Sequence, residues 1–492
     1  MEKRLLTIFT FLMLLATITR AQITIHGIVV DEENEPMIGV SLSAKDTNAF
    51  FLDVPLSPKN RNNGTSITDI DGKFTIEVPQ EGAKIWVNYP GYQPTTVQAK
   101  DGMVVNMKEE KKLKPRQERR SIQLTDDDRA AIKGINSLSL RLLATLGQHK
   151  STIMSPLSIA CLLSLTSNGA SGKTQREICR LLKCTPEVAN SLYHKLTPFL
   201  TDSRYGSRFN MANALFVNPA YPLKALFRQV AADDYSAFIS QDMNVKTVND
   251  WCARQTSGMI PSIIEQIPDE ASLVALNTVF FESLWKKEFD EKETKEEPFS
   301  REDGTIRLMP VMHQKGIYSY GRGDNFSILT KDYKGEVNYK MTIFLPDEGC
   351  TLGQMLSQLT EEKWQEARRT IGSYRVDVKL PRFKTETELQ LTPTIKQLGI
   401  QAAFLPAKAD FRRLADNKSG LPIYISDMKQ KAIIEVNEKG TRAAAATAEI
   451  VIVGYGRTHY EDRIFHAKRP FAYMIRETYT DTILFIGTYY GD

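Results

Sequence analysis

The chain has 492 residues, of which 42% are hydrophobic and 25% are charged. That length exceeds what one core usually organises, so two domains are expected, with the composition of an ordinary globular protein. The formal net charge of +4 is small and gives no reason to expect nucleic acid or an anionic membrane as a partner. The five cysteines are an odd number without a CxxC pair, so most are expected to be buried free thiols.

Residues 1–21 have the pattern of a signal peptide. Lys3 and Arg4 form a basic start, residues 5–18 are mostly apolar but short for a bilayer span, and Ala21 precedes a cut at Gln22. An uncleaved anchor helix is the alternative. The prediction is a secreted protein, extracellular or periplasmic. It is not a lipoprotein because no cysteine lies near the cut, and no other apolar run has transmembrane length.

Residues 22–107 are predicted to be all-β. Alternating apolar and polar residues occur at 23–25, 74–76 and 85–87, separated by Gly, Pro, Asn and Asp. Asp71-Gly72, between Ile70 and Phe74, is typical of a hairpin turn. The Gly and Pro residues are interpreted as turn formers rather than as a binding site.

This segment resembles the carboxypeptidase-regulatory-like β-sandwich domain found in Bacteroidetes surface proteins. The resemblance rests on GIVVD at 27–31, PMIGV at 36–40, TDIDGKF at 68–74 and YPGY at 89–92. Residues 47–63 are longer than the link that the family usually has there, which indicates an insertion. The resemblance implies a bacterial protein whose first domain has a surface partner or acts as a spacer.

Residues 108–121 are rich in Lys and Arg, partly offset by Glu, and have no apolar stripe. They are predicted to be a solvated linker. From residue 122 to residue 492 helix and strand patterns alternate without a βαβ rhythm, which favours an α+β fold with large mixed sheets. Helices are expected at 126–146 and 157–166, and strands at 273–281, 340–345, 374–380, 432–436 and 482–487.

No motif of an enzyme, a cofactor site or a metal site is present: GxSxG, HExxH, a Walker loop and GxGxxG after a strand are all missing. The six histidines are not at ligand spacing. The sequence therefore predicts no catalytic residue, no cofactor and no metal.

An unusual tract lies near the C-terminus. A buried strand at 432–436 is followed by Asn437-Glu438-Lys439-Gly440-Thr441-Arg442, by four alanines at 443–446 and by an apolar run at 450–453. Four alanines normally favour a helix, but this tract has no polar helical face and runs into β-branched residues. Small residues can also slide between two existing strands. These residues alone are about equally compatible with two interpretations. One is a loop that later becomes a central strand, and the other is a plain Ala helix or linker.

The segment from residue 122 to residue 492 resembles the serpin family along its whole length. The matching segments are SPLSI at 155–159, NGA at 168–170 with Thr174, NALFV at 213–217, VNDW at 248–251 with Thr256, Gly258 and Ile260, LNTVFF at 276–281 with Trp285 and Phe289, LPRF at 380–383, LGI at 398–400 with Phe404, RPF at 469–471 and LFIG at 484–487. So many matches in the same order are specific.

The resemblance implies a large mixed-sheet fold with an exposed reactive-centre loop between about Gly440 and Arg469. It implies suicide inhibition of serine endopeptidases, and of cysteine endopeptidases as a second class, by covalent trapping and strand insertion. The inhibitory hinge is assigned to Glu438, Gly440, Thr441, Ala443, Ala444, Ala445 and Ala446. The shutter and breach regions, which control opening of the main sheet, are assigned to Ser155, Ser158, Asn213, Trp285 and Gln430. Gln430 departs from the His of many animal serpins, but it can still donate and accept hydrogen bonds.

Two points of the loop stay open. If Thr441 faces the core of the inserted strand, Glu449 does so as well, and an unpaired buried carboxylate is costly. Counting fourteen residues from Gly440 puts the cut at Gly454-Tyr455, with Val453 and Arg457 as alternatives. The target is accordingly an elastase-, subtilisin-, chymotrypsin- or trypsin-like protease. A serpin-fold binding protein that does not trap, docked through its β-sandwich domain, is the competing interpretation.

Overall fold

The computed structural model describes residues 23–492 apart from residues 33, 45–64, 90–91, 109–120, 148, 202–206, 257, 259, 336–337, 417–419, 421 and 442–459. The predicted signal peptide, the insertion at 47–63 and nearly all of the predicted linker lie outside the described residues. The chain divides into two compact units, residues 1–117 and 118–492, and the division falls inside the predicted linker.

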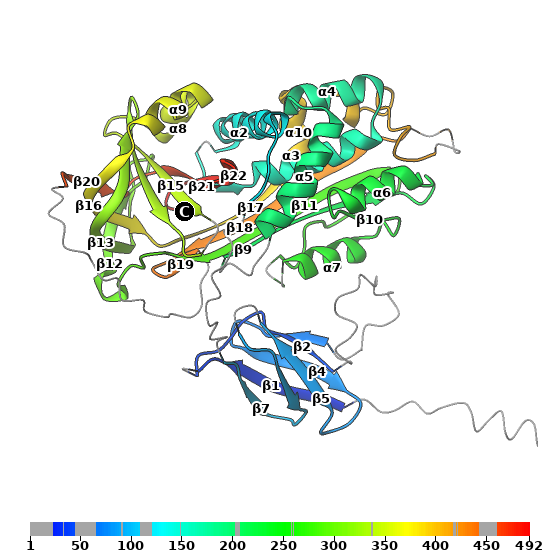
Figure 1. Ribbon diagram of the computed structural model, residues 1–492, viewed down its shortest axis with the longest axis horizontal. Coiled ribbons are helices and arrows are strands. Elements are labelled where there is room, and N and C mark those ends of the chain that lie inside the picture. Colours follow the sequence, from blue (N-terminus) through cyan, green and yellow to red (C-terminus); the bar gives the residue numbers. More distant parts are fainter. Residues whose placement is uncertain are drawn as a thin grey trace, which may run out of the picture. The chain divides into compact units, whose positions relative to one another are not determined.

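The first unit contains two small sheets around one hydrophobic core (Figure 1). One sheet has the order β4 (Lys73–Val78), β1 (Ile23–Val30) and β7 (Met103–Asn106). The other has the order β3 (Thr65–Ile67), β2 (Ser41–Ser43), β5 (Lys84–Asn88) and β6 (Thr95–Gln98). Alternate residues of β4 and β5 are buried, as the alternating sequence predicts.

The expected hairpin at Asp71-Gly72 is wrong in its pairing, although a tight turn does form. Gly72 has a φ of +71°, and Asp69 accepts hydrogen bonds from the backbone nitrogens of Asp71 and Lys73 at 3.0 and 2.8 Å. The strands on either side of the turn, β3 and β4, belong to different sheets. The turn therefore carries the chain from one sheet to the other, because β4 pairs with β1 instead.

The second unit is built on two large sheets. The first has the order β10 (Phe238–Ser240), β9 (Ser207–Val217), β11 (Leu273–Leu284), β19 (Gly440–Thr441), β18 (Ile425–Val436) and β17 (Phe383–Gln390). The second has the order β20 (Asp462–His466), β16 (Gly372–Pro381), β13 (Ile306–Arg322), β14 (Phe326–Asp332), β15 (Tyr339–Pro346), β21 (Phe471–Glu477), β22 (Thr482–Tyr489) and β8 (Thr152–Met154), with β12 (Lys295–Ser300) paired to β13.

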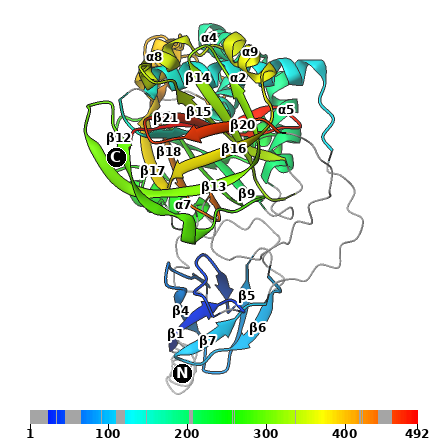
Figure 2. The same cartoon turned by 90° about the vertical axis from the view of Figure 1, so that its left-hand side faces the viewer.

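The helices cover the first of these sheets on both faces (Figure 1). On one side lie α2 (Asp126–Leu146), α3 (Pro156–Gly169), α4 (Gly172–Leu182), α5 (Pro186–Thr201) and α10 (Leu391–Gln397). On the other lies α7 (Val245–Gln255), whose Trp251 packs in a smaller cluster with Phe216 and Leu276. Further helices are α6 (Ala225–Asp233), α8 (Leu352–Gln358), α9 (Glu361–Arg369) and the 3-10 turns η3 (Glu291–Glu293) and η4 (Ala402–Phe404). Figure 2 shows the second sheet with β16 and β20 in front.

Local sequence signals explain where the principal helices begin. Thr125 and Asp128 form a capping box at the start of α2, which satisfies free backbone donors there. Ser155 caps α3, and Pro156 occupies its first turn. Every residue of α3 except Asn168 is buried, so this helix forms the centre of the core beneath the sheet. The predicted helices at 126–146 and 157–166 and all five predicted strands are present.

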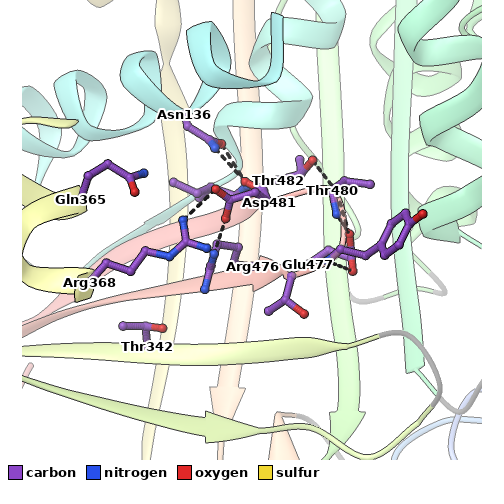
Figure 3. Close-up of polar contacts among 12 residues, drawn as sticks. Asn136, Thr342, Gln365, Arg368, Arg476, Glu477, Thr480, Asp481 and Thr482 are labelled. Atoms are coloured by element: carbon purple, nitrogen blue, oxygen red, sulfur yellow. Dashed lines mark hydrogen bonds and ion pairs between the residues drawn. The ribbon is translucent and has the colours of Figure 1, made fainter. Parts of the chain in front are cut away.

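A polar cluster ties α2 and α9 to the turn between β21 and β22 (Figure 3). The Asp481 carboxylate pairs with Arg476 and with Arg368, the latter at 2.8 Å, while Asn136 donates a hydrogen bond to the Asp481 carbonyl at 2.7 Å. Arg476 is almost fully buried, so its charge needs this partner. The cluster holds two helices on the second sheet.

Candidate functional site: the fork in the main sheet

The two central strands of the first large sheet separate along their length. β11 and β18 pair directly, in parallel, from Leu273 to Val279. Beyond that point β19 lies between them, antiparallel to both, so that Thr441 is opposite Ser283 on one side and Val436 on the other. The sheet is therefore forked, and Gly440 and Thr441, two of the residues predicted for the hinge, already lie in the fork.

The segment that follows β11 donates hydrogen bonds to the backbone carbonyls of residues 437–439, at the start of the predicted hinge. The backbone nitrogen of Trp285 donates to the Lys439 carbonyl at 2.7 Å, and the indole nitrogen of Trp285 donates to the Asn437 carbonyl at 2.9 Å. The backbone nitrogen of Phe289 donates to the Glu438 carbonyl at 2.9 Å. We call these contacts, together with those of Tyr333 below, the hinge latch.

Tyr333, the residue that follows β14, completes the hinge latch. Its ring stacks on Trp285 with centroids 4.4 Å apart and planes 15° apart. Its hydroxyl lies 2.5 Å from the Thr441 hydroxyl. Thr441 is fully buried, so its side chain faces the core. Burial raises the pKa of Tyr333 well above its ordinary value, which keeps this phenol neutral.

The carboxylate of Glu438 is buried but charge-paired. Its side chain is 4% exposed, and Arg382 donates to both oxygens from Nε at 2.6 and 2.8 Å. The Thr294 hydroxyl donates to the same carboxylate at 2.5 Å. Charge-assisted bonds of this kind are strong, so Glu438 anchors the start of the hinge beside β17.

A buried polar network lies where β11 and β18 still pair. Gln430 accepts a hydrogen bond from the Ser155 backbone nitrogen at 2.9 Å and donates to Asn277 Oδ1 at 2.8 Å. Asn277 in turn donates to Ser158 and, at 2.9 Å, to Asn213 Oδ1. The structure thus brings together Ser155, Ser158, Asn213 and Gln430, four of the five residues predicted for the shutter and breach regions, while the fifth, Trp285, lies in the hinge latch.

Asn277 is the residue of this network that sequence reasoning did not single out. It lies directly opposite Gln430 and is fully buried. The available signal was a lone amide within the apolar run LNTVFF, because a buried amide requires polar partners. Any strand that enters between β11 and β18 must break the bond between Asn277 and Gln430.

A second anchor holds the chain that follows the loop. β20 pairs in parallel with β16 at an edge of the second sheet. There Asp377 Oδ1 lies 2.9 Å from His313 Nε2 and 3.3 Å from His466 Nε2, and Lys315 lies 3.0 Å from its other oxygen. Burial alone would raise the pKa of Asp377, but hydrogen bonds from Lys315, His313 and His466 outweigh it and lower the pKa to about 2.

Part of the sequence-predicted site lies outside the described residues. This applies to Ala443, Ala444, Ala445 and Ala446 of the hinge and to the cleavage candidates Val453, Gly454, Tyr455 and Arg457. In the part of the chain that the structure describes, no three His, Cys, Asp or Glu side chains form a group that could hold a metal ion. Nor does any described helix combine the length and apolar character needed to cross a membrane. All five cysteines are free thiols, with Cys161 and Cys252 buried.

Comparisons with known proteins agree with this architecture. The chain is 31% identical over 354 residues to antithrombin-III of Mus musculus, covering 68% of this chain and 75% of that one. It is 31% identical over 372 residues to Serpin B6 of Pongo abelii, covering 72% and 97%.

Among solved structures, the native thermophilic serpin tengpin matches with a TM-score of 0.69 and 26% identity, covering 76% of this chain and 96% of that one. Human thyroxine-binding globulin complexed with thyroxine matches with a TM-score of 0.64 and 25% identity, covering 73% and 98%. The sequence profile of the family described as Serpin (serine protease inhibitor) matches residues 133–491. Together with the forked sheet, these matches show that the chain belongs to the serpin family.

Proposed function

We propose that this serpin is a suicide inhibitor of serine endopeptidases, with cysteine endopeptidases as a second class of target. The active-site hydroxyl of the protease attacks the scissile carbonyl carbon, the amine of the next residue leaves with a proton, and an acyl ester joins loop and enzyme. Insertion of the cleaved loop into the sheet then drags the acylated protease and distorts its active site before water can hydrolyse the ester.

The observation that carries this proposal is β19, a strand already begun inside the fork. Its antiparallel register, continued from Thr441, would set Ala443 opposite Phe281 and Ile434. Directly opposed residues point to the same face of a sheet, and both partners are buried in the main core. An alanine can fill such a position between large side chains, which fits Ala443 and, on the same face two residues later, Ala445.

The same register gives the inserting strand a polar partner at the shutter. Thr447 would lie at the level of Asn277 and Gln430, which are opposite each other before insertion. Its hydroxyl can both donate and accept. Thr447 would therefore replace the hydrogen bond between those two amides that insertion has to break.

Glu449 is the exception in this register. It would lie at the level of Ala275 and Met428, both fully buried in the hydrophobic core. A carboxylate that is ionised there without a partner costs several kcal/mol or takes up a proton. This position limits how stable the inserted form becomes.

The proposed scissile bond is Gly454-Tyr455, with cleavage after Val453, Tyr455 or Arg457 as the alternatives. Gly454 or Val453 would suit elastase-like or subtilisin-like enzymes, Tyr455 chymotrypsin-like ones and Arg457 trypsin-like ones. Mass spectrometry of the C-terminal peptide released by each protease identifies the bond.

A protease panel resolved on a denaturing gel tests trapping. A covalent complex that survives denaturation is expected with at least one of the four classes. The matched control is Thr441→Arg, because Thr441 is fully buried and a long cation at that position should block entry of the strand. This variant should be cleaved without forming the complex. Clean cleavage of the unmodified protein, with active protease left over, would overturn the proposal.

The competing function is that of a binding protein which does not trap. The likeness to thyroxine-binding globulin complexed with thyroxine favours this second candidate. It predicts cleavage of the loop by the whole panel with no complex, and a ligand that binds the uncleaved chain.

We further propose a bacterial, secreted protein, extracellular or periplasmic, whose first 21 residues are removed. Its residues 22–107 would form a carboxypeptidase-regulatory-like domain that docks on a surface partner or spaces the inhibitor. Export of the full chain followed by mass spectrometry should give a mature N-terminus at Gln22. An N-terminus at Met1 in the exported protein would contradict this assignment.

A further inference from the structure

A lysine is buried behind the hinge latch. Lys331 lies on β14, two residues before Tyr333, and only 3% of it is exposed. Its ammonium donates to the Lys287 carbonyl at 2.5 Å and points toward Gln314 Oε1 at 3.4 Å. Both acceptors are neutral, so neither offsets the charge as a carboxylate would.

Three aromatic rings enclose the same ammonium. It lies 4.2 Å from the ring centroid of Phe289, 5.3 Å from that of Trp285 and 5.5 Å from that of Tyr318. We call these rings and Lys331 the lysine cage. Burial raises the pKa of Tyr318, so this ring is neutral and attracts a cation only through its π face, a contribution of roughly 0.5–2 kcal/mol per ring.

The charges that face the lysine cage do not balance the cost of burial. Burial and, to a smaller extent, repulsion by Lys287 lower the pKa of Lys331 to about 7, although attraction by Asp332 and Glu288 opposes both effects. Asp332 is also engaged by Lys340 at 3.1 Å. The amine therefore gains and loses its proton near neutrality, whereas an ordinary lysine stays charged.

The lysine cage and the hinge latch share residues. Trp285 and Phe289 belong to the cage, and they also donate the hydrogen bonds that hold the carbonyls of Asn437, Glu438 and Lys439. A change of charge inside the cage therefore acts next to the Trp285 indole and next to the two backbone nitrogens that hold residues 437–439.

We propose that Lys331 makes the hinge latch sensitive to pH: protonation of its amine inside the aromatic cage loosens the hold on residues 437–441. Insertion of the hinge strand then proceeds faster in mildly acidic than in mildly alkaline medium. The proposal rests on the proposed inhibitory function, because it treats hinge insertion as the motion that matters.

The direction follows from proton linkage. In the unfolded chain the amine is in water and keeps its ordinary pKa, so the native fold disfavours the proton. The unfavourable contribution of Lys331 to the stability of the native form is therefore absent above about pH 10, grows as the pH falls toward about 7, and is level below that. Insertion relieves this cost when it opens the lysine cage and lets water reach the ammonium, because loss of hydration is the main cause of the lowered pKa.

Lys331→Met tests the proposal in the full chain, because methionine fills the cage without a charge. The first readout is the denaturant midpoint of the uncleaved protein between about pH 6 and about pH 9. The variant should be more stable than the parent, with an advantage that grows as the pH falls to about 7. Lys384→Met, on an exposed position of β17, is the control and should follow the parent.

The second readout is the rate at which the uncleaved protein converts to a heat-resistant, loop-inserted form. The parent should convert about tenfold faster at pH 6 than at pH 8, and Lys331→Met should convert slowly at both. A variant that keeps the pH profile of the parent overturns the proposal, because every histidine is retained. If Lys331→Met changes the denaturant midpoint but not the conversion rate, protonation of Lys331 does not control insertion of the hinge, and the proposal is overturned.

A second substitution covers failure of the methionine variant to fold. Lys331→Arg stays charged throughout this pH range and should convert fast with a flat profile; a profile like that of the parent would again overturn the proposal. Neither readout uses a protease. If the parent shows the expected pH profile of conversion but does not trap a protease, the result counts against the proposed function only. If the parent traps a protease but its conversion rate does not change with pH, the result counts against this inference only.

Discussion

Gly440 is the residue on which the pairing of β19 with β11 depends most directly. A Cβ atom at this position would lie 2.2 Å from the Ser283 carbonyl oxygen and 2.8 Å from the Leu284 Cα atom. Both are backbone atoms of β11, so they cannot rotate out of the way. The absence of a side chain is therefore what lets the hinge approach β11 closely enough to pair.

Gly440→Ala is expected to push β19 out of the fork. The melting temperature of the uncleaved protein should fall by several degrees, since losses of about 1–3 kcal/mol are usual when backbone atoms are forced apart. If the protein traps a protease as proposed, slower insertion should also raise the number of inhibitor molecules consumed per protease molecule inactivated. Gly353→Ala in α8 is the control, because the nearest atom to an added Cβ there, Thr351 Oγ1, is 4.0 Å away. Equal effects of the two substitutions would contradict the argument.

Glu449→Ala tests the register of the inserting strand. If Glu449 enters the core at the level of Ala275 and Met428, removing its carboxylate should raise the melting temperature of the cleaved protein and leave that of the uncleaved one unchanged. Arg442→Ala, at a position of the opposite parity, should have little effect on either form. An unchanged melting temperature of cleaved Glu449→Ala would count against this register.

At the scale of elements, the pairing of β20 with β16 is supported by one carboxylate. The pairing is parallel, and the carboxylate is that of Asp377, which receives hydrogen bonds from His313, His466 and Lys315. Because the pKa of Asp377 is lowered to about 2, its contribution to stability is complete above the ordinary value of about 4. The contribution is lost as the pH falls from about 4 through about 2.

Asp377→Asn should abolish this part of the acid response. The variant should melt at a lower temperature than the parent at pH 5, and the difference should shrink as the pH approaches about 2. Melting curves at intervals of about half a pH unit measure it. Asp462→Asn on the same edge is the control, since its carboxylate is mostly exposed. A difference that stays constant with pH would show that the loss is steric.

At the scale of the whole molecule, the chain consists of two units with separate cores. Residues 118–492 expressed alone should therefore keep the melting temperature of the serpin unit and, if the full chain traps a protease, trap it at the same rate. Calorimetry of the full chain should show two transitions, of which the truncated protein retains one. A truncated protein that fails to fold would contradict the independence of the units.

The sequence predicted the main elements because their signals are local. α2 has its capping box and helical periodicity, and β11 is a long apolar run. The shutter residues were assigned by resemblance, and the network that joins them through Asn277 was not, because it depends on which strands are neighbours. Lys331 was missed for the same reason: its cage comes from β13, β14 and the segment after β11. The position of β19 between β11 and β18 likewise depends on the separation of two strands that are far apart in the sequence.

The two residues of β19 also bear on the kinetics of insertion. Starting a strand between two others is slow, because residues must be ordered before the hydrogen bonds that compensate for them exist. Here Gly440 and Thr441 already hold that position. An inserting strand that continues from Thr441 would therefore start from a formed nucleus and add one residue after another. In the proposed trapping mechanism, growth of the strand beyond Thr441 would then decide whether insertion precedes hydrolysis of the acyl ester, and substitution of residues 442–449 should change the speed of that growth.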